Sequence, residues 1–133
     1  MLYFYVGISV IDMMEKKTLV LGASLKPQRF AYKAIIKLTR YNIPVVAVGM
    51  REGSIGEVRI EKPFPEVHGI HTITLYIGKK NQPFFLDYIL KVNPVRVIFN
   101  PGTENPEMEK LLEAKGIEVV HNCMLVMLSK GVF

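Results

Sequence analysis

The stretch TLVLGASLKPQRFAYKAI, residues 18–35, contains an apolar run, a glycine turn and the start of an amphipathic segment. The apolar run over 18–23 reaches Gly22 without a charged residue, which is typical of a strand buried on both faces. Apolar residues then recur at helical spacing from Ala31 onward, and the opposite side of this segment is basic. The stretch therefore predicts a strand, a turn and a helix, the first half of a parallel α/β unit.

The same alternation of strands and helices continues to the end of the chain. Further strands are predicted over 44–48, 71–77, 95–99 and 117–120. Helices are predicted from about Pro83, with Asn81 as the N-cap, from Asn105 to Gly116, and over 124–128. The stretch 49–69 is rich in Gly, Pro and charge, and we expect a long loop with a short strand around 58–60. The predicted class is α/β: a Rossmann-like doubly wound sheet of about five parallel strands with helices on both faces.

Composition limits the classes of function. The 133 residues are 50% hydrophobic and 22% charged, as expected for one globular domain. The net charge of +5 suits an anionic ligand, although an inert basic surface explains it equally well. No dense Lys/Arg block or recognition motif is present, so we expect no nucleic-acid partner. The single cysteine, Cys123, allows no internal disulfide and favours a cytoplasmic protein.

Residues 1–16 stand apart from a domain predicted over 17–133. The apolar run over 2–11 has no basic region before it and is too short to span a membrane, so we expect neither a signal peptide nor a membrane partner. Two interpretations stay open. The segment is an extra strand or homo-oligomer contact, or it is an extension upstream of a start at Met13 or Met14.

The turn after the first strand has the features of a phosphate site. Gly22 lets the backbone approach a phosphate closely, and the free amides at the helix start attract anions. Ser24 adds a hydroxyl donor, while Arg29 and Lys33 add positive charge. A tight turn with solvated basic residues is the alternative.

The second loop bears on which nucleotide is bound. The chain lacks the G-x-G-x-x-G and Walker A patterns, and it lacks an acidic residue after the second strand to hold the ribose of NAD. It has Gly49-Met50-Arg51 there instead. A basic residue at this place disfavours NAD and suits a ribose phosphate, as in NADP or coenzyme A.

No catalytic set is predicted, and no metal site either. The three histidines lack metal-ligand spacing, and Cys123 lies in an apolar run that favours a buried thiol. A Cys–His pair of Cys123 with His121 is the single catalytic arrangement worth testing.

Three segments carry a family resemblance: GASLKPQRFAYKAI, VVAVGM and VIFNPGTENPEMEKLLEAKGIEVVHNCMLVML. They resemble the small stand-alone CoA-binding domain proteins, which are similar to the CoA-binding domain of the succinyl-CoA synthetase α subunit. The resemblance runs from about Lys17 to the C-terminal end. Many relatives have Asn-Pro where this chain has Gly49-Met50.

The resemblance implies a ligand, coenzyme A or an acyl-CoA, lying across the carboxyl ends of the strands. By position it implies four groups of contacts: Gly22, Ala23 and Ser24 in the phosphate turn with Arg29 nearby, Val48, Gly49 and Met50 beside the adenosine, Ile77, Gly78 and Lys79 in the third loop, and Asn100, Pro101 and Gly102 in the fourth. The synthetase's catalytic histidine domain is missing, so a non-catalytic or accessory module is expected. An NADP-dependent oxidoreductase and an oligomeric interaction protein without a nucleotide are the alternatives.

Overall fold

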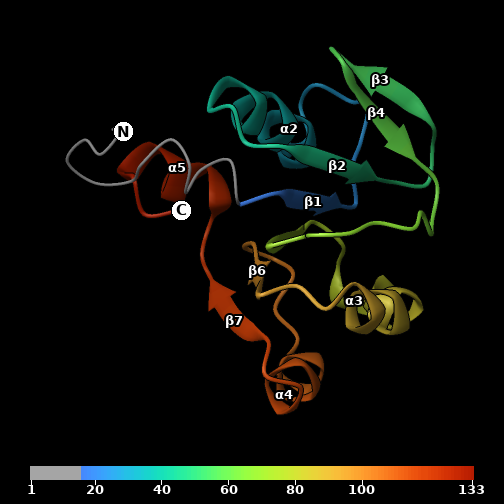
Figure 1. Cartoon of the computed structure of the whole chain (residues 1–133), viewed down its shortest axis with the longest axis vertical. Coiled ribbons are helices and arrows are strands. Elements are labelled where there is room, and N and C mark those ends of the chain that lie inside the picture. The colour runs from blue at the N-terminus through green and yellow to red at the C-terminus, as the bar shows by residue number, and fades with distance from the viewer. Residues whose placement is uncertain (1–15) are drawn as a thin grey trace.

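The five predicted strands pair side by side in the computed structural model, which describes residues 16–133. They are β1 (Thr18–Leu21), β2 (Val45–Val48), β5 (Thr72–Leu75), β6 (Arg96–Phe99) and β7 (Glu118–His121). All neighbouring pairs among them are parallel, in the order β2-β1-β5-β6-β7 (Figure 1). The chain builds outward from β1 in one direction and then returns to build in the other, which confirms the Rossmann-like fold.

The register of the sheet brings the carboxyl ends of these strands to one level. Leu21, the last residue of β1, lies opposite both Val48 of β2 and Leu75 of β5. Phe99 of β6 is in turn opposite Leu75 and His121. The loops after β1, β2, β5 and β6 therefore begin side by side along one edge of the sheet.

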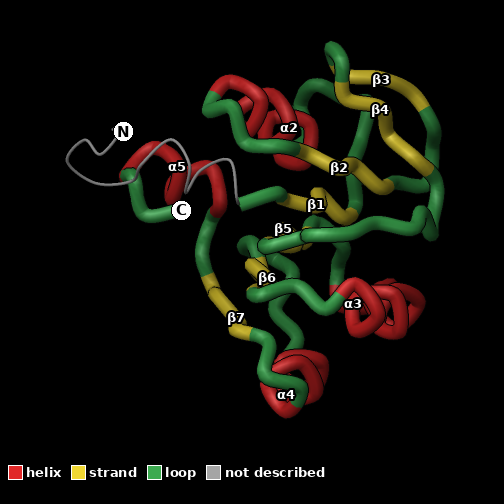
Figure 2. The backbone as a smooth tube through the Cα atoms, viewed as in Figure 1, coloured by secondary structure: helices red, strands yellow, loops and turns green. Residues whose placement is uncertain are grey.

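The sheet is larger than predicted, because a hairpin occupies part of the expected long loop. β3 (Gly53–Ile55) and β4 (Val58–Glu61) are antiparallel, and β4 pairs in parallel with β2, giving seven strands in all (Figure 2). The hairpin turn begins at Gly56, which has a φ of +59° and so adopts a conformation that favours glycine. The short strand expected around 58–60 is β4, and β3 was not predicted.

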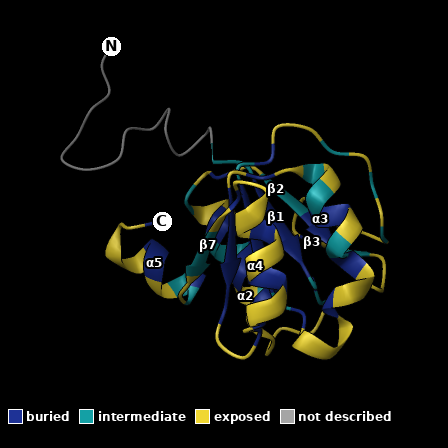
Figure 3. Cartoon of the chain, turned by 90° about the horizontal axis from the view of Figure 1, so that it is seen from below, coloured by how far each residue is buried: buried dark blue, intermediate teal, exposed yellow. Residues whose placement is uncertain are grey.

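Helices cover both faces of the sheet, as predicted. α2 (Phe30–Arg40) and α5 (Met124–Lys130) pack on one face, around Val20, Ala47 and Ile98. The 3₁₀ helix η1 (Lys79–Phe85), α3 (Leu86–Val92) and α4 (Pro106–Ala114) pack on the other face, around Leu19, Ile73 and Val97. Figure 3 shows the centre of the sheet in the buried colour between these layers, with the exposed residues of the helices turned outward, whereas the edge strand β7 is not buried.

Of the two asparagines predicted as helix N-caps, Asn105 is confirmed and Asn81 is not. Asn105 is the N-cap of α4, and its Oδ1 accepts a hydrogen bond from the Met108 N–H at 3.3 Å. The prediction for Asn81 is wrong, because Asn81 lies inside η1, which begins after Gly78. Its backbone N–H donates to the Gly78 carbonyl at 3.0 Å, closing a tight turn that replaces the first turn of the expected helix.

The interpretations of residues 1–15 fall outside the described residues and stay predictions, as does the division of the chain at residue 16. Among residues 16–133, no helix is long and apolar enough to cross a membrane.

Candidate nucleotide-binding site

Two adjoining cavities open where β1, β2, β5 and β6 end. The larger has a volume of about 900 Å³ and the smaller about 380 Å³. Both are lined by Gly22, Ser24, Lys26, Tyr76 and Gly78, so they form one continuous crevice. Its size is that of a cofactor site, and its position is where open parallel sheets bind ligands.

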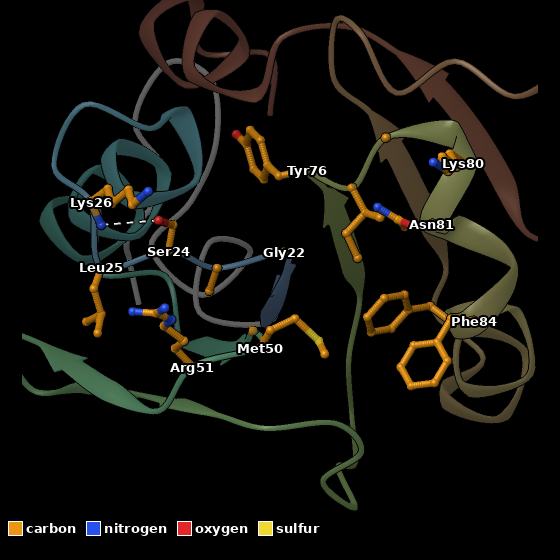
Figure 4. Close-up of a pocket in the computed structure, with 15 residues that line it drawn as sticks. Gly22, Ser24, Leu25, Lys26, Met50, Arg51, Tyr76, Lys80, Asn81 and Phe84 are labelled. Carbon is orange, nitrogen blue, oxygen red and sulfur yellow. Dashed lines mark hydrogen bonds between the residues drawn. The ribbon is translucent and has the colours of Figure 1, made fainter.

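The β1–α2 turn, residues 22–29, is the floor shared by the two cavities. The N–H groups of Gly22 and Ala23 both donate to the Val48 carbonyl at 2.9 Å, which pins the turn to β2. The Ser24 hydroxyl oxygen accepts from the Lys26 N–H at 3.1 Å (Figure 4). Within residues 16–133, the N–H groups of Ser24 and Leu25 have no hydrogen-bond partner. Two backbone donors are therefore left for a ligand in this turn.

Gly22 is required by geometry as well as by conformation. Its φ is +99°, and a Cβ atom there would lie 2.9 Å from Ile77 Cγ1 and 3.0 Å from the Tyr76 carbonyl oxygen. The β1–α2 turn thus approaches the loop after β5 more closely than a side chain would allow.

The start of α2 adds further donors next to this turn. Arg29 is the N-cap in an extended conformation, makes no side-chain capping bond, and no acidic residue lies in the first turn. The first amides of the helix are therefore uncapped, and they carry the positive end of the helix dipole. Arg29, Phe30 and Ala31 line the smaller cavity. This arrangement favours an anionic group in the crevice.

The loop after β2 forms the opposite wall of the larger cavity. Gly49, Met50 and Arg51 line it, and the Gly49 N–H donates to the Glu61 carbonyl at 2.9 Å. A Cβ atom at Gly49 would lie 2.4 Å from the Ala23 carbonyl oxygen, so the two loops touch backbone to backbone. Val48 faces the core and contributes its carbonyl to the β1–α2 turn rather than a side chain to the cavity.

The third and fourth loops close the crevice. Ile77 and Gly78 line the larger cavity, and Pro101 and Gly102 line the smaller one. Four predicted residues line neither cavity: Lys33, Val48, Lys79 and Asn100.

Lys33 and Asn100 have other contacts. The Lys33 ammonium lies 5.3 Å from the centre of the Phe30 ring. Asn100 is buried and donates to Thr74 Oγ1 at 2.8 Å and to the Leu75 carbonyl at 2.9 Å, while its Oδ1 accepts from the Met124 N–H at 2.9 Å. Asn100 therefore ties β5 to α5 beneath the crevice.

Sequence reasoning missed the aromatic wall of the larger cavity. Phe84 is 60% exposed at its mouth, and its ring packs on Phe64 and Phe85 with centroid distances of 5.2 and 5.0 Å. Met50, itself 66% exposed, extends toward these rings across the cavity (Figure 4). The one available signal was the Phe84-Phe85 pair, since Phe84 lies about 100° away from Phe85 around a helix and so points in a different direction.

Tyr76 was missed as well. Its ring lines both cavities, and its hydroxyl is buried without a hydrogen-bond partner in the described part of the chain. Burial raises the pKa of this hydroxyl well above its usual value, so it stays protonated.

The residues considered for catalysis lie in other arrangements. His121 Nε2 is 2.7 Å from Glu109 Oε1, and the His121 ring packs edge-to-face on Phe99. No hydrogen bond joins His121 and Cys123 within residues 16–133, and neither residue lines either of the two cavities. In the same part of the chain, no group of three His, Cys, Asp or Glu side chains could hold a metal ion.

Together these features define a Rossmann-like α/β domain with an open crevice at the carboxyl edge of its sheet. The chain belongs to the CoA binding domain family, whose model matches residues 16–129. This confirms the resemblance seen in the sequence.

Solved structures agree with this assignment. The crystal structure of an uncharacterized protein is 46% identical, covers 89% of this chain and 98% of its own, and has a TM-score of 0.86. A Thermus thermophilus protein is 26% identical over 89% of this chain and 90% of its own, with a TM-score of 0.73. A hypothetical protein from Pyrococcus horikoshii OT3, at 23% identity, 96% and 94% coverage and a TM-score of 0.77, shares the fold. No curated protein matches the chain.

Proposed function

We propose that this chain binds coenzyme A or an acyl-CoA in the crevice, as a non-catalytic or accessory module. The observation that carries the proposal is the group of free backbone donors at the β1–α2 turn. The Ser24 and Leu25 amides and the uncapped start of α2 adjoin the same crevice, and no acidic side chain lies in the first turn of α2 to compete. In this proposal the donors hold the diphosphate, with Lys26 and Arg29 adding charge.

Arg51 is assigned to the ribose 3′-phosphate. It lines the larger cavity, is exposed, and has no ion-pair partner within residues 16–133. A free guanidinium can hold a phosphate bidentately. The nearby Met50 and Phe84 provide the apolar surfaces that an adenine ring needs on its two faces.

The non-catalytic role is supported by what the crevice walls contain. They present amides, hydroxyls, cations and apolar side chains, while His121 and Cys123 lie outside the walls. Binding and orienting a ligand require only the amides, hydroxyls, cations and apolar side chains that line the crevice. The proposal therefore assigns no chemical step to this chain.

Isothermal titration calorimetry with CoA, dephospho-CoA and NADP tests the proposal. We expect wild-type protein to bind CoA more tightly than dephospho-CoA, and to bind NADP weakly or not at all. Arg51→Ala should weaken CoA binding about tenfold and leave dephospho-CoA binding unchanged, because one charge-assisted contact is lost. Arg40→Ala is the matched control, since Arg40 is an exposed arginine that lines neither cavity.

No heat with either CoA form at millimolar concentration would refute the proposal. Tight binding of NADP in place of CoA would favour the oxidoreductase alternative instead.

A further inference from the structure

Gln82 lies fully buried in η1, between the loops that follow β5 and β6. Its Nε2 donates to the Ile77 carbonyl at 2.9 Å and to the Thr103 carbonyl at 2.6 Å. Its Oε1 accepts from Asn105 Nδ2 at 2.8 Å. Both amide hydrogens are thus used, and each is used on a different loop.

The residues that carry these two carbonyls line different cavities. Ile77 lines the larger cavity, Thr103 lines the smaller one, and Gln82 itself lines neither. β5 ends at Leu75 and β6 at Phe99, so both carbonyls lie beyond the paired strands. The Gln82 amide consequently supplies a cross-link that the sheet does not provide.

The cross-link is part of a longer chain of hydrogen bonds, which is buried from Gln82 to Glu109 and ends at the exposed His121. The Asn105 N–H donates to Glu109 Oε2 at 2.9 Å, and Glu109 Oε1 lies 2.7 Å from His121 Nε2 at the end of β7. The Asn105 Oδ1 is also used, because it caps α4. A network in which each member is satisfied holds its geometry firmly in a low-dielectric interior.

We propose that Gln82 is a positioning residue of the crevice, which sets the spacing of the third and fourth loops and so the shape in which the ligand is received. The inference rests on the proposed function for the identity of that ligand. The role of Gln82 is indirect: it acts on the ligand through the walls formed by Ile77 and Thr103.

Two measurements on Gln82→Met test this role, since methionine has a similar length but no donor. Hydrogen exchange of the ligand-free protein should become about tenfold faster in residues 76–82 and 100–105, with β1 and the β1–α2 turn unchanged. In calorimetry, CoA binding should weaken about tenfold because the walls are no longer held in place. Leu38→Ala is the control: Leu38 is a buried residue of α2, in the cluster on the other face of the sheet, and its truncation should lower stability without either local effect.

The positioning role would be overturned if exchange became equally faster throughout the chain or stayed unchanged in residues 76–82 and 100–105. Wild-type CoA affinity in Gln82→Met would overturn it as well. If the wild type does not bind CoA, the proposed function fails, while the exchange pattern still decides whether Gln82 couples the two loops. Gln82→Glu repeats both measurements if the methionine variant does not fold, because a carboxyl group, even when protonated, can donate to only one of the two carbonyls. Failure of both variants to fold would make Gln82 a folding residue and reject the proposal.

Discussion

Replacing Gly49 with alanine should push the β1–α2 turn away from the loop after β2. The added Cβ would lie 2.4 Å from the Ala23 carbonyl oxygen, whereas real Cβ atoms stay beyond 3.0 Å. One of the two backbones must therefore move by at least 3.0 − 2.4 = 0.6 Å. Because the Gly22 and Ala23 amides are pinned to the Val48 carbonyl, the movement also strains those bonds. Overpacking of this kind costs about 1–3 kcal/mol.

Thermal unfolding followed by circular dichroism measures this cost. For a chain of this length, each kcal/mol lowers the Tm by about 3–4 °C, so we expect a decrease of about 3–12 °C. Gly78→Ala is the matched control, because Gly78 lines the same crevice, has a φ of −63°, and has nothing within 4 Å of its Cβ position. Its Tm should stay unchanged or rise slightly, since alanine restricts the unfolded chain.

Gly49→Ala also tests whether the position of the β1–α2 turn affects ligand binding. Gly49→Ala should also weaken CoA binding about tenfold, because the displaced turn no longer presents its amides to the ligand in register. Gly78→Ala is the control for stability alone, because Gly78 itself lines both cavities. If Gly49→Ala unfolds at the wild-type temperature and binds CoA normally, the close backbone approach does not exist in solution and the reasoning fails.

Three further variants probe the buried hydroxyl, the pH response and the aromatic wall. Tyr76→Phe should raise the free energy of unfolding in urea by about 1 kcal/mol, because it removes a buried hydroxyl that has no partner in residues 16–133; a loss of stability would mean that the hydroxyl is bonded in solution. Burial, followed by the positive charges of Arg96 and Lys16, lowers the pKa of His71 below its usual value. The unfolded chain therefore binds a proton at His71 more readily than the folded protein does, and the free energy of unfolding decreases as the pH drops below about 6.5. His71→Gln should remove that part of the pH dependence, and an unchanged profile would contradict the assignment. Phe84→Ala should weaken CoA binding about three- to tenfold with little effect on Tm, since Phe84 is largely exposed. The control Leu111→Ala, at a residue of α4 that is also exposed, should bind CoA as the wild type does.

The sheet could be predicted because its main strands are buried on both faces. β1, β5 and β6 have only buried residues, so β1 and β5 stand out as continuous apolar or β-branched runs, and β6 does so after Arg96. β3 could not be predicted in this way, because Gly53-Ser54-Ile55 is stabilised by pairing with β4 and not by its own pattern. The alternation of strands and helices also predicted which loops form the crevice, because it implies a parallel sheet whose strands have their carboxyl ends at one edge.

The residues that were missed depend on contacts between distant parts of the chain. Gln82 bonds to a carbonyl 21 residues away, and nothing in its own neighbourhood signals this partner. Its inward position depends on η1 being a 3₁₀ helix, whereas the sequence favours an α-helix capped by Asn81. Asn100 is the opposite case. Its place in a loop predicted a ligand contact, whereas its side-chain amide makes three hydrogen bonds within the protein. Conformation within a loop, and not its location, decides which side chains reach the crevice.

The most direct test of the phosphate assignment is a titration of ¹⁵N-labelled protein with CoA, followed by amide chemical shifts. We expect the largest changes at the Ser24 and Leu25 amides and at the first amides of α2, with smaller changes from Gly49 to Arg51. Adenosine 3′,5′-bisphosphate, which lacks the diphosphate bridge and the pantetheine arm, should reproduce the changes near Arg51 more strongly than those at the turn. Saturable binding of CoA that leaves the Ser24, Leu25 and α2 amides unshifted would contradict the account.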